Sequence, residues 1–239
     1  MLIPILIATS FSLGFFVESI VGFGGGLIAY SILGFFTDIK TMVIAGLYIG
    51  TASSAYIVYT GRQYFNFKIL KSILPLSLIG TVFGVFIFSK LSSETLALGL
   101  GGLLIILSIK TTFFDSYILP KIFKNKLILI GGISHGSFGI GGPFIVNALK
   151  KDFANKSELR TTMAAFFVLL NIVRIAQLFL QNQINIEFFT QIWWVIIPVF
   201  VAIYFGYHVH LKISESFFKK LIGMVTFFAG IKFLSKVFL

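Results

Sequence analysis

The sequence contains no cysteine among its 239 residues. Disulfide bonds, zinc–thiolate sites and thiol chemistry are therefore excluded. Charge is also scarce, because only 11% of the chain is Asp, Glu, Lys or Arg, against about 25% in a soluble domain. With 57% hydrophobic residues, these few charges could not cover the surface that a soluble fold of this size exposes to water. A soluble globular protein is excluded, and much of the surface must face lipid.

Acidic residues are the rarer charges, since 8 Asp and Glu stand against 19 Lys and Arg, for a net charge of +11. In a soluble protein this excess would raise the question of nucleic-acid binding. In a membrane protein, basic residues gather in the loops that face the cytoplasm, which explains the excess without a nucleic-acid partner. No pair of His or carboxylate residues has metal-ligand spacing, and we expect neither a metal nor a cofactor.

Apolar stretches fill nearly the whole chain. A bilayer-spanning helix needs about 20 apolar residues, so this length allows about eight membrane segments and no sizeable domain outside the membrane. Polar or basic residues separate stretches at about 2–36, 41–60, 72–89, 96–113, 127–149, 161–180, 191–208 and 216–238. The sequence therefore predicts an all-α polytopic membrane protein.

Two of these stretches have similar glycine-rich centres. A shift of 117 in the numbering superimposes their glycines and lays Glu18 on His135. A shift of 122 lays Gly101 on Gly223 near the other ends. These matches predict an internal duplication, with halves at 1–115 and 118–239 in one integral membrane domain. The superimposed glycines are Gly22, Gly24 and Gly25 in the first copy and Gly139, Gly141 and Gly142 in the second.

The basic residues indicate how the glycine-rich stretches lie in the membrane. If each stretch dips in and returns, one face collects most of the Lys and Arg, and the other keeps only Lys40, Lys90, Lys232 and Lys236. If each crosses once, the same residues divide evenly, against the cytoplasmic bias. We therefore favour returning hairpins, although two long crossings within 2–36 would give the same sidedness.

One hairpin and three spans in each half make an odd number of crossings, so the second half would be inverted relative to the first. Inverted repeats are a common plan of secondary transporters, in which broken helices from the two halves meet near the bilayer midplane. The sequence thus predicts two inverted-topology repeats, each a glycine-rich broken helix followed by three transmembrane helices.

The glycine clusters predict irregular backbone, which survives in a bilayer only where protein or a water-filled cavity covers it. We expect short helices to restart at Gly26 and at Pro143, with their free N–H groups and positive ends facing the turns. Two such ends would make an anion site shaped by the superimposed glycines. The alternative is close helix packing through small residues.

Arg174 is the one basic residue well inside a span, and it shares a helical stripe with Asn171, Gln177 and Gln181. Ionisable residues within spans usually serve function, so we expect Arg174 and Asn171 to bind the anion. The alternative is that Arg174 extends to the interface. Glu18 and His135 occupy equivalent places and could relay protons, or they could only satisfy backbone groups.

The segment from Gly132 to Gly136 matches the Gly-x-Ser-x-Gly pattern of a hydrolase nucleophile elbow. That elbow needs a strand before the serine and a helix after it. No strand is predicted here, and we do not expect an enzyme.

Both glycine motifs, Gly22–Gly26 and Gly139–Pro143, lie early in their halves of an eight-segment duplicated chain. In these motifs and this layout the sequence resembles the sulfite exporter TauE/SafE family of bacterial and archaeal membrane proteins. The resemblance implies transport of small sulfur-containing or organic anions such as sulfite, sulfonates or sulfoacetate.

The residues and the resemblance together predict a multi-pass secondary transporter of the inner cell membrane, which moves a small anion coupled to the proton gradient. An anion channel, an intramembrane enzyme and a membrane assembly factor are the alternatives. The expected partners are the substrate anion and the lipid bilayer, and the sequence leaves a homo-oligomer open.

Overall fold

The computed structural model describes residues 2–21, 24–113, 121–149, 151–184, 186–209 and 215–238. In these ranges every regular element is a helix, and six segments are long and apolar enough to cross a membrane. The prediction of an all-α polytopic membrane protein is confirmed. The six segments are α1 (Leu2–Val21), α3 (Ile39–Gly61) with η1 (Arg62–Tyr64), α4 (Phe67–Lys90), α5 (Ser93–Phe113), α8 (Lys156–Leu180), and α9 (Ile186–Ile192) continued by η3 (Trp193–Val195) and α10 (Ile196–Val209).

The glycine-rich stretches contain the shorter helices. Residues 2–36 hold α1 and then α2 (Gly25–Leu33), and residues 127–149 lie in α6 (Lys124–Phe138) and α7 (Gly142–Leu149). At about 1.5 Å per residue, α2 and α7 extend only about 12–14 Å, less than half of a hydrocarbon core. The alternative of two long crossings within 2–36 is therefore not what the structure shows. The remaining elements are η2 (Lys121–Phe123) and α11 (Glu215–Phe238).

The helices form two compact units. Unit 1 contains Met1–Gly46, Leu91–Tyr117 and Glu187–Leu239, and unit 2 contains Leu47–Lys90 and Ile118–Ile186. Each unit takes helices from both predicted halves. The spatial units are thus not the halves 1–115 and 118–239, and the duplication stays a prediction.

In unit 2, α4 and α6 pack backbone against backbone. A Cβ atom at Gly80 of α4 would lie 2.5 Å from the Leu129 carbonyl oxygen, and one at Gly132 of α6 would lie 2.5 Å from that of Ser77. Gly84 and Gly136 repeat this contact one turn further along. Glycines four residues apart allow two helices to approach this closely. Gly132 and Gly136 therefore serve helix packing, and the Gly-x-Ser-x-Gly match lies inside α6 rather than on a strand-to-helix turn.

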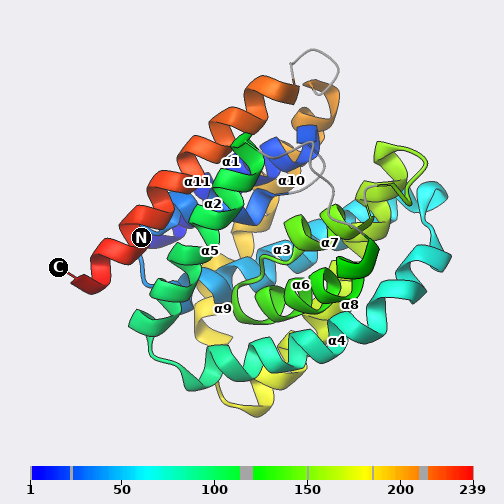
Figure 1. The fold of residues 1–239 in the computed structure, drawn as a ribbon. Coiled ribbons are helices and arrows are strands. Elements are labelled where there is room, and N and C mark those ends of the chain that lie inside the picture. Colours follow the sequence, from blue (N-terminus) through cyan, green and yellow to red (C-terminus); the bar gives the residue numbers. More distant parts are fainter. Residues whose placement is uncertain are drawn as a thin grey trace. The chain divides into compact units, whose positions relative to one another are not determined.

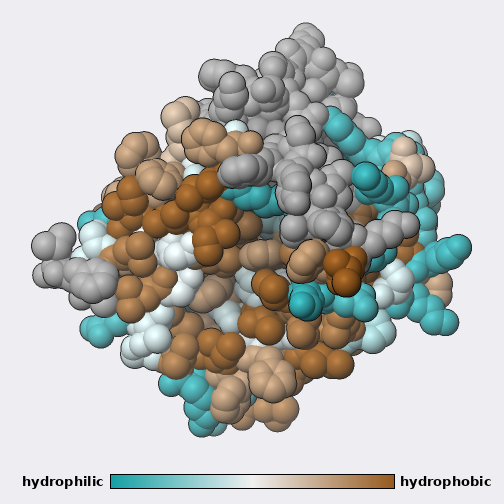
Figure 2. All heavy atoms as spheres, in the orientation of Figure 1, coloured by the Kyte–Doolittle hydropathy of each residue, from teal (hydrophilic) through white to brown (hydrophobic). Residues whose placement is uncertain are grey.

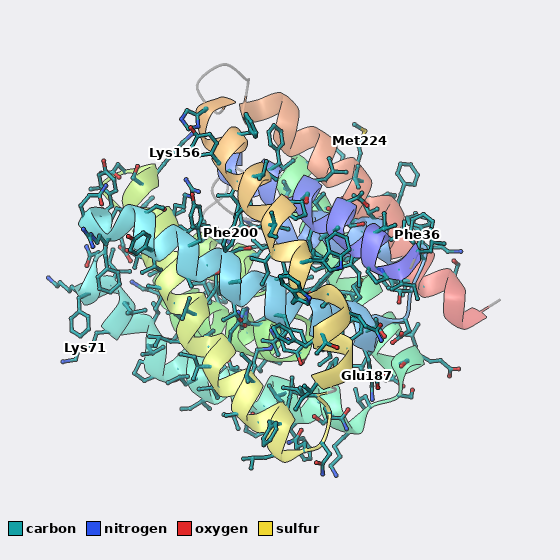
Figure 3. All side chains as sticks on the ribbon, turned by 180° about the vertical axis from the view of Figure 1, so that it is seen from behind. Phe36, Lys71, Lys156, Glu187, Phe200 and Met224 are labelled. Carbon is teal, nitrogen blue, oxygen red and sulfur yellow. The ribbon has the colours of Figure 1, made fainter. Side chains whose placement is uncertain are left out.

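The α6–α7 hairpin begins and finishes at the same end of unit 2. Nζ of Lys124, at the start of α6, forms an ion pair with Oδ2 of Asp152, after α7, at 2.6 Å. At this end, Nδ2 of Asn66, before α4, donates to Oε1 of Glu158, in the first turn of α8, at 2.5 Å. Figure 3 labels Lys71, near the start of α4, and Lys156, the first residue of α8, both toward the left of the view. The stretch 127–149 is thus a returning hairpin.

The far end of unit 2 holds the ends of α4 and α8, where the Ser89 hydroxyl donates to the side-chain oxygen of Gln181. Because α4 and α8 are linked at both ends, they run in the same direction through the unit. The start of α8 is fixed locally, since Oδ1 of its N-cap residue Asn155 accepts from the Glu158 N–H at 2.9 Å.

In unit 1, α2 folds back along α1, and α11 lies against α5 (Figure 1). The rings of Phe11 and Tyr30 meet edge to face across α1 and α2, with centroids 6.1 Å apart. Gly101 faces Gly230, while the Ser108 hydroxyl donates to the Gly223 carbonyl oxygen at 2.7 Å. As the numbering rises on α5 it falls on α11, so these two helices are antiparallel.

Much of the face shown in Figure 2 is apolar. On α4, Ile79, Phe83 and Phe86 are 56%, 63% and 51% exposed, whereas Ile73 and Phe88 are buried. A stripe of exposed large apolar residues at helical spacing is what a helix presents to lipid.

The returning hairpin can be tested with single cysteines, because the chain has none of its own. Cysteine at Lys126 or Lys156 should react with an impermeant maleimide from one side of the membrane, and cysteine at Lys90 or Gln183 only from the other. Labelling of positions 126 and 156 from opposite sides would mean that residues 127–149 cross the membrane. A cysteine at Lys71 is the control, since its position shares an end with Lys156 through the link between Asn66 and Glu158.

Candidate functional site

His135 of α6 meets Asn171 and Arg174 of α8 in the interior of unit 2. Their exposed fractions are 4%, 3% and 1%. Nε2 of His135 lies 3.0 Å from Oδ1 of Asn171, and Nη1 of Arg174 donates to the same oxygen at 3.2 Å. The structure thus brings His135 together with Asn171 and Arg174, two residues that the sequence had placed on one stripe of α8.

Arg174 is the largest of the described side chains that are less than 2% exposed. An arginine that extends to the interface keeps its guanidinium in contact with water and headgroups. Arg174 is instead buried, and its Nη1 donates to Asn171. The observed geometry therefore favours an interior role for this charge.

Phe167 joins these residues, and the sequence reading did not include it. Its ring stacks on that of His135, with centroids 5.0 Å apart and an interplanar angle of 15°. Phe167 lies four residues before Asn171, so helical spacing places both on one face of α8. That spacing could have identified it. We call His135, Phe167, Asn171 and Arg174 the His135 cluster.

The cluster reaches the start of α7. A Cβ atom on Gly142, the first residue of α7, would lie 3.4 Å from Cζ of Phe167. One on Gly141 would lie 2.8 Å from Cβ of His135 and would overlap the Gly131 carbonyl oxygen. The N-terminal end of a helix carries partial positive charge and free N–H groups. The His135 cluster therefore lies beside a positive helix end.

The turn between α6 and α7 is held by its own backbone and by a serine. Gly139 has a φ of +76°, and its N–H donates to the His135 carbonyl oxygen at 2.7 Å, which closes α6. The Ser134 hydroxyl donates to the Ile140 carbonyl oxygen at 2.5 Å. α7 begins at Gly142, one residue before Pro143, which occupies its first turn as expected.

The first hairpin, in unit 1, differs at the equivalent place. Oε2 of Glu18 accepts from the Gly25 N–H at 2.6 Å, so a carboxylate lies at the N-terminal end of α2. Gly24 has a φ of +97°, and α2 begins at Gly25, one residue before the expected restart. Gly22 lies outside the described residues. The first hairpin thus carries an acid of its own, where the second has His135.

The polar stripe of α8 continues beyond Arg174 along α4. Nε2 of Gln177 donates to the Val82 carbonyl oxygen at 3.1 Å, and Gln181 accepts from Ser89 at the far end of the unit. Polar side chains therefore run from the His135 cluster to the end opposite Lys124 and Asp152.

The hydrogen bond from the Gly25 N–H to Glu18, which we call the Glu18 cap, should stabilise the fold. Replacing Glu18 with Ala removes the acceptor of the Gly25 N–H and should lower the free energy of unfolding by about 1 kcal/mol or more. Glu18→Gln keeps an oxygen acceptor and should lose less. Thermal unfolding of the purified variants in detergent measures both effects, with Glu94→Ala, an exposed acid in the first turn of α5, as control. Equal loss for the Ala variants at positions 18 and 94 would contradict the cap.

Alanine variants of the glycines between α6 and α7 can distinguish a role in helix packing from a role in anion binding. Gly141→Ala should give little folded protein, because its methyl group would overlap the Gly131 carbonyl oxygen. Gly142→Ala should fold, since its methyl would make ordinary contact with Phe167, but it adds bulk where the cluster meets α7 and should weaken anion binding. Gly26→Ala is the matched control, because a Cβ there would meet nothing within 4 Å. Yield, melting temperature and anion affinity are measured on all three variants. Normal binding by folded Gly142→Ala would move the anion away from the start of α7.

Comparison with known proteins matches residues 6–233 to the model of one family, described as sulfite exporter TauE/SafE. No curated protein and no solved structure matches the chain. The matched range includes both hairpins and the whole His135 cluster. Because it extends over nearly the entire sequence, the chain belongs to the sulfite exporter TauE/SafE family of multi-pass membrane transporters.

Proposed function

We propose that the protein is a secondary transporter that moves a small sulfur-containing or organic anion, such as sulfite or a sulfonate, across the inner cell membrane. Family membership and the membrane-spanning helices support transport. The observation that supports an anionic substrate is the burial of Arg174, a permanent positive charge that is 1% exposed within a span. Buried charges in spans typically mark a substrate or ion pathway.

The second hairpin supplies the rest of the proposed site. The anion would bind Arg174 and Asn171 near the start of α7, whose N–H groups and dipole favour negative charge. Gly139 permits the turn, Gly141 permits close packing on α6, and Gly142 leaves room beside Phe167. Gly142, the first residue of α7, thus places no side chain of its own beside Phe167.

The first hairpin takes a different proposed role. Gly24 and Gly25 shape its turn, but the Glu18 carboxylate already lies at the N-terminal end of α2. We therefore assign anion binding to the second hairpin. Glu18 is the proposed acid of the proton pathway, because protonation weakens its bond with the Gly25 N–H and so links proton uptake to the geometry of this hairpin. We assign His135, the other residue with a predicted proton role, to the anion site beside Asn171 and Arg174.

Inverted repeats belong to this proposal, and the antiparallel pair of α5 and α11 supports them. A shift of 122 carries Gly101 to Gly223 and Ser108 to Gly230. The contact between Gly101 and Gly230 therefore maps onto the contact between Ser108 and Gly223. A two-fold axis that related the two halves would carry each of these two contacts onto the other.

Uptake of labelled anions into proteoliposomes tests the function. Sulfite and alkylsulfonates should show saturable flux, counter-flow and stimulation by a proton gradient. Conductance without counter-flow would instead indicate a channel. Absence of flux with co-purification of a partner would indicate an assembly factor.

Arg174 provides the sharpest variant. Arg174→Gln should lose at least about tenfold in anion affinity, because a charge-assisted contact is removed from a buried site. Arg174→Lys should retain part of it, since the charge stays but the planar fork is lost. Arg62→Gln, an exposed arginine in η1, is the matched control and should transport normally. Near-normal flux by folded Arg174→Gln would remove Arg174 from the site.

A further inference from the structure

We propose that Asn171 is a positioning residue that fixes His135 in one tautomer, so that its Nδ1 accepts a hydrogen bond from the anion. The site would then select anions that carry an O–H group, such as hydrogen sulfite, over anions of equal charge without one. This inference rests on the proposed function, because it concerns the same anion site.

The first step identifies the amide oxygen of Asn171. The two end atoms of an amide have nearly the same shape, so their hydrogen bonds decide which is which. A guanidinium has donors and no acceptor. The Asn171 atom that lies 3.2 Å from Nη1 of Arg174 must therefore be the oxygen.

The second step identifies the tautomer of His135. Nε2 lies 3.0 Å from that same amide oxygen. An amide oxygen only accepts, so Nε2 must carry the hydrogen. Adding a second proton to the ring would place another positive charge beside Arg174 in a buried site, which is unfavourable. The neutral ring has a single N–H, and Nδ1 is left with a lone pair.

The third step concerns that lone pair. Nδ1 is buried and has no hydrogen-bond partner among the described residues. Phe167, which stacks on the ring, supplies no donor. Turning the ring over to satisfy Nδ1 would break the bond between Nε2 and Asn171. A buried acceptor without a donor is unusual in proteins and needs an explanation, and a donor on the bound anion supplies one.

The chemistry of the cluster then defines the ligand. Its oxygens accept from Arg174, and one O–H donates to Nδ1 of His135. A singly protonated oxyanion has both features. An alkylsulfonate has the same charge and oxygens of similar geometry but no O–H, so it leaves Nδ1 unpaired. Sites that bind a hydroxyl through a buried partner reject analogues that lack it.

Binding of two probes tests the selection. Affinities of hydrogen sulfite and methanesulfonate are measured on the purified protein at mildly acidic pH, where sulfite is largely singly protonated. The unmodified protein should prefer hydrogen sulfite by about tenfold, the worth of one buried hydrogen bond. His135→Phe keeps a ring against Phe167 and removes the acceptor, so the ratio of the two affinities should fall to about one.

Asn171 is tested by its effect on the tautomer. Nitrogen-15 NMR of histidine-labelled protein distinguishes the two neutral forms, and the chain has only three histidines to assign. His135 should carry its hydrogen on Nε2, and Asn171→Leu should shift it toward Nδ1 and reduce the preference for hydrogen sulfite. Gln177→Leu, on the same stripe, is the control and should change neither.

The outcomes separate this inference from the proposed function. Equal affinity of the unmodified protein for both probes, or a hydrogen on Nδ1 of His135, would overturn the inference and leave an anion transporter. Equal losses for both probes in His135→Phe would also overturn it. If the unmodified protein binds and transports neither anion, both proposals fail.

Discussion

A helix that ends in apolar surroundings leaves backbone groups without hydrogen-bond partners, and the need to satisfy these groups governs both hairpins. In the first hairpin a side chain satisfies the free backbone N–H, because the Glu18 carboxylate accepts from the Gly25 N–H at the start of α2. In the second hairpin the turn satisfies its own backbone groups. The Gly139 N–H donates to the His135 carbonyl oxygen, and the Ser134 hydroxyl donates to the Ile140 carbonyl oxygen. The first helix end is therefore occupied by an acid of the protein, while the second has a basic cluster beside it.

The same constraint sorts the glycines by purpose. Gly24 and Gly139 have positive φ, which lets a helix stop and the chain turn within very few residues. Gly80 and Gly132 have ordinary backbone and permit contact between α4 and α6. The two uses look alike in a sequence, because both place glycines a few residues apart in an apolar stretch. The structure distinguishes them by the sign of φ and by the presence of a facing backbone.

Much of the fold followed from the sequence, because apolar length and glycine position are local properties. The spacing of Asn171 and Arg174 placed both on one face of α8, and both lie there. The helix that packs against that face could not be predicted from residue spacing. His135 lies 36 residues from Asn171, and helical periodicity states which side is polar without stating which helix it meets. Phe167 has the helical spacing to share the face of Asn171, but an aromatic residue in an apolar run does not indicate contact with a histidine until the neighbouring helix is known.

The contact between α4 and α6 also limits how the molecule can move and be divided. α4 belongs to the predicted half 1–115 and α6 to 118–239, and their backbones touch with no side chain between them. In unit 1, Gly206 of α10 meets the Phe16 carbonyl oxygen of α1 in the same crosswise manner. The two sequence halves are thus interlaced, and a transport cycle cannot swing one against the other as rigid bodies. Produced as separate fragments, each half would lack the helix on which its own hairpin packs, so neither could complete its fold before finding the other.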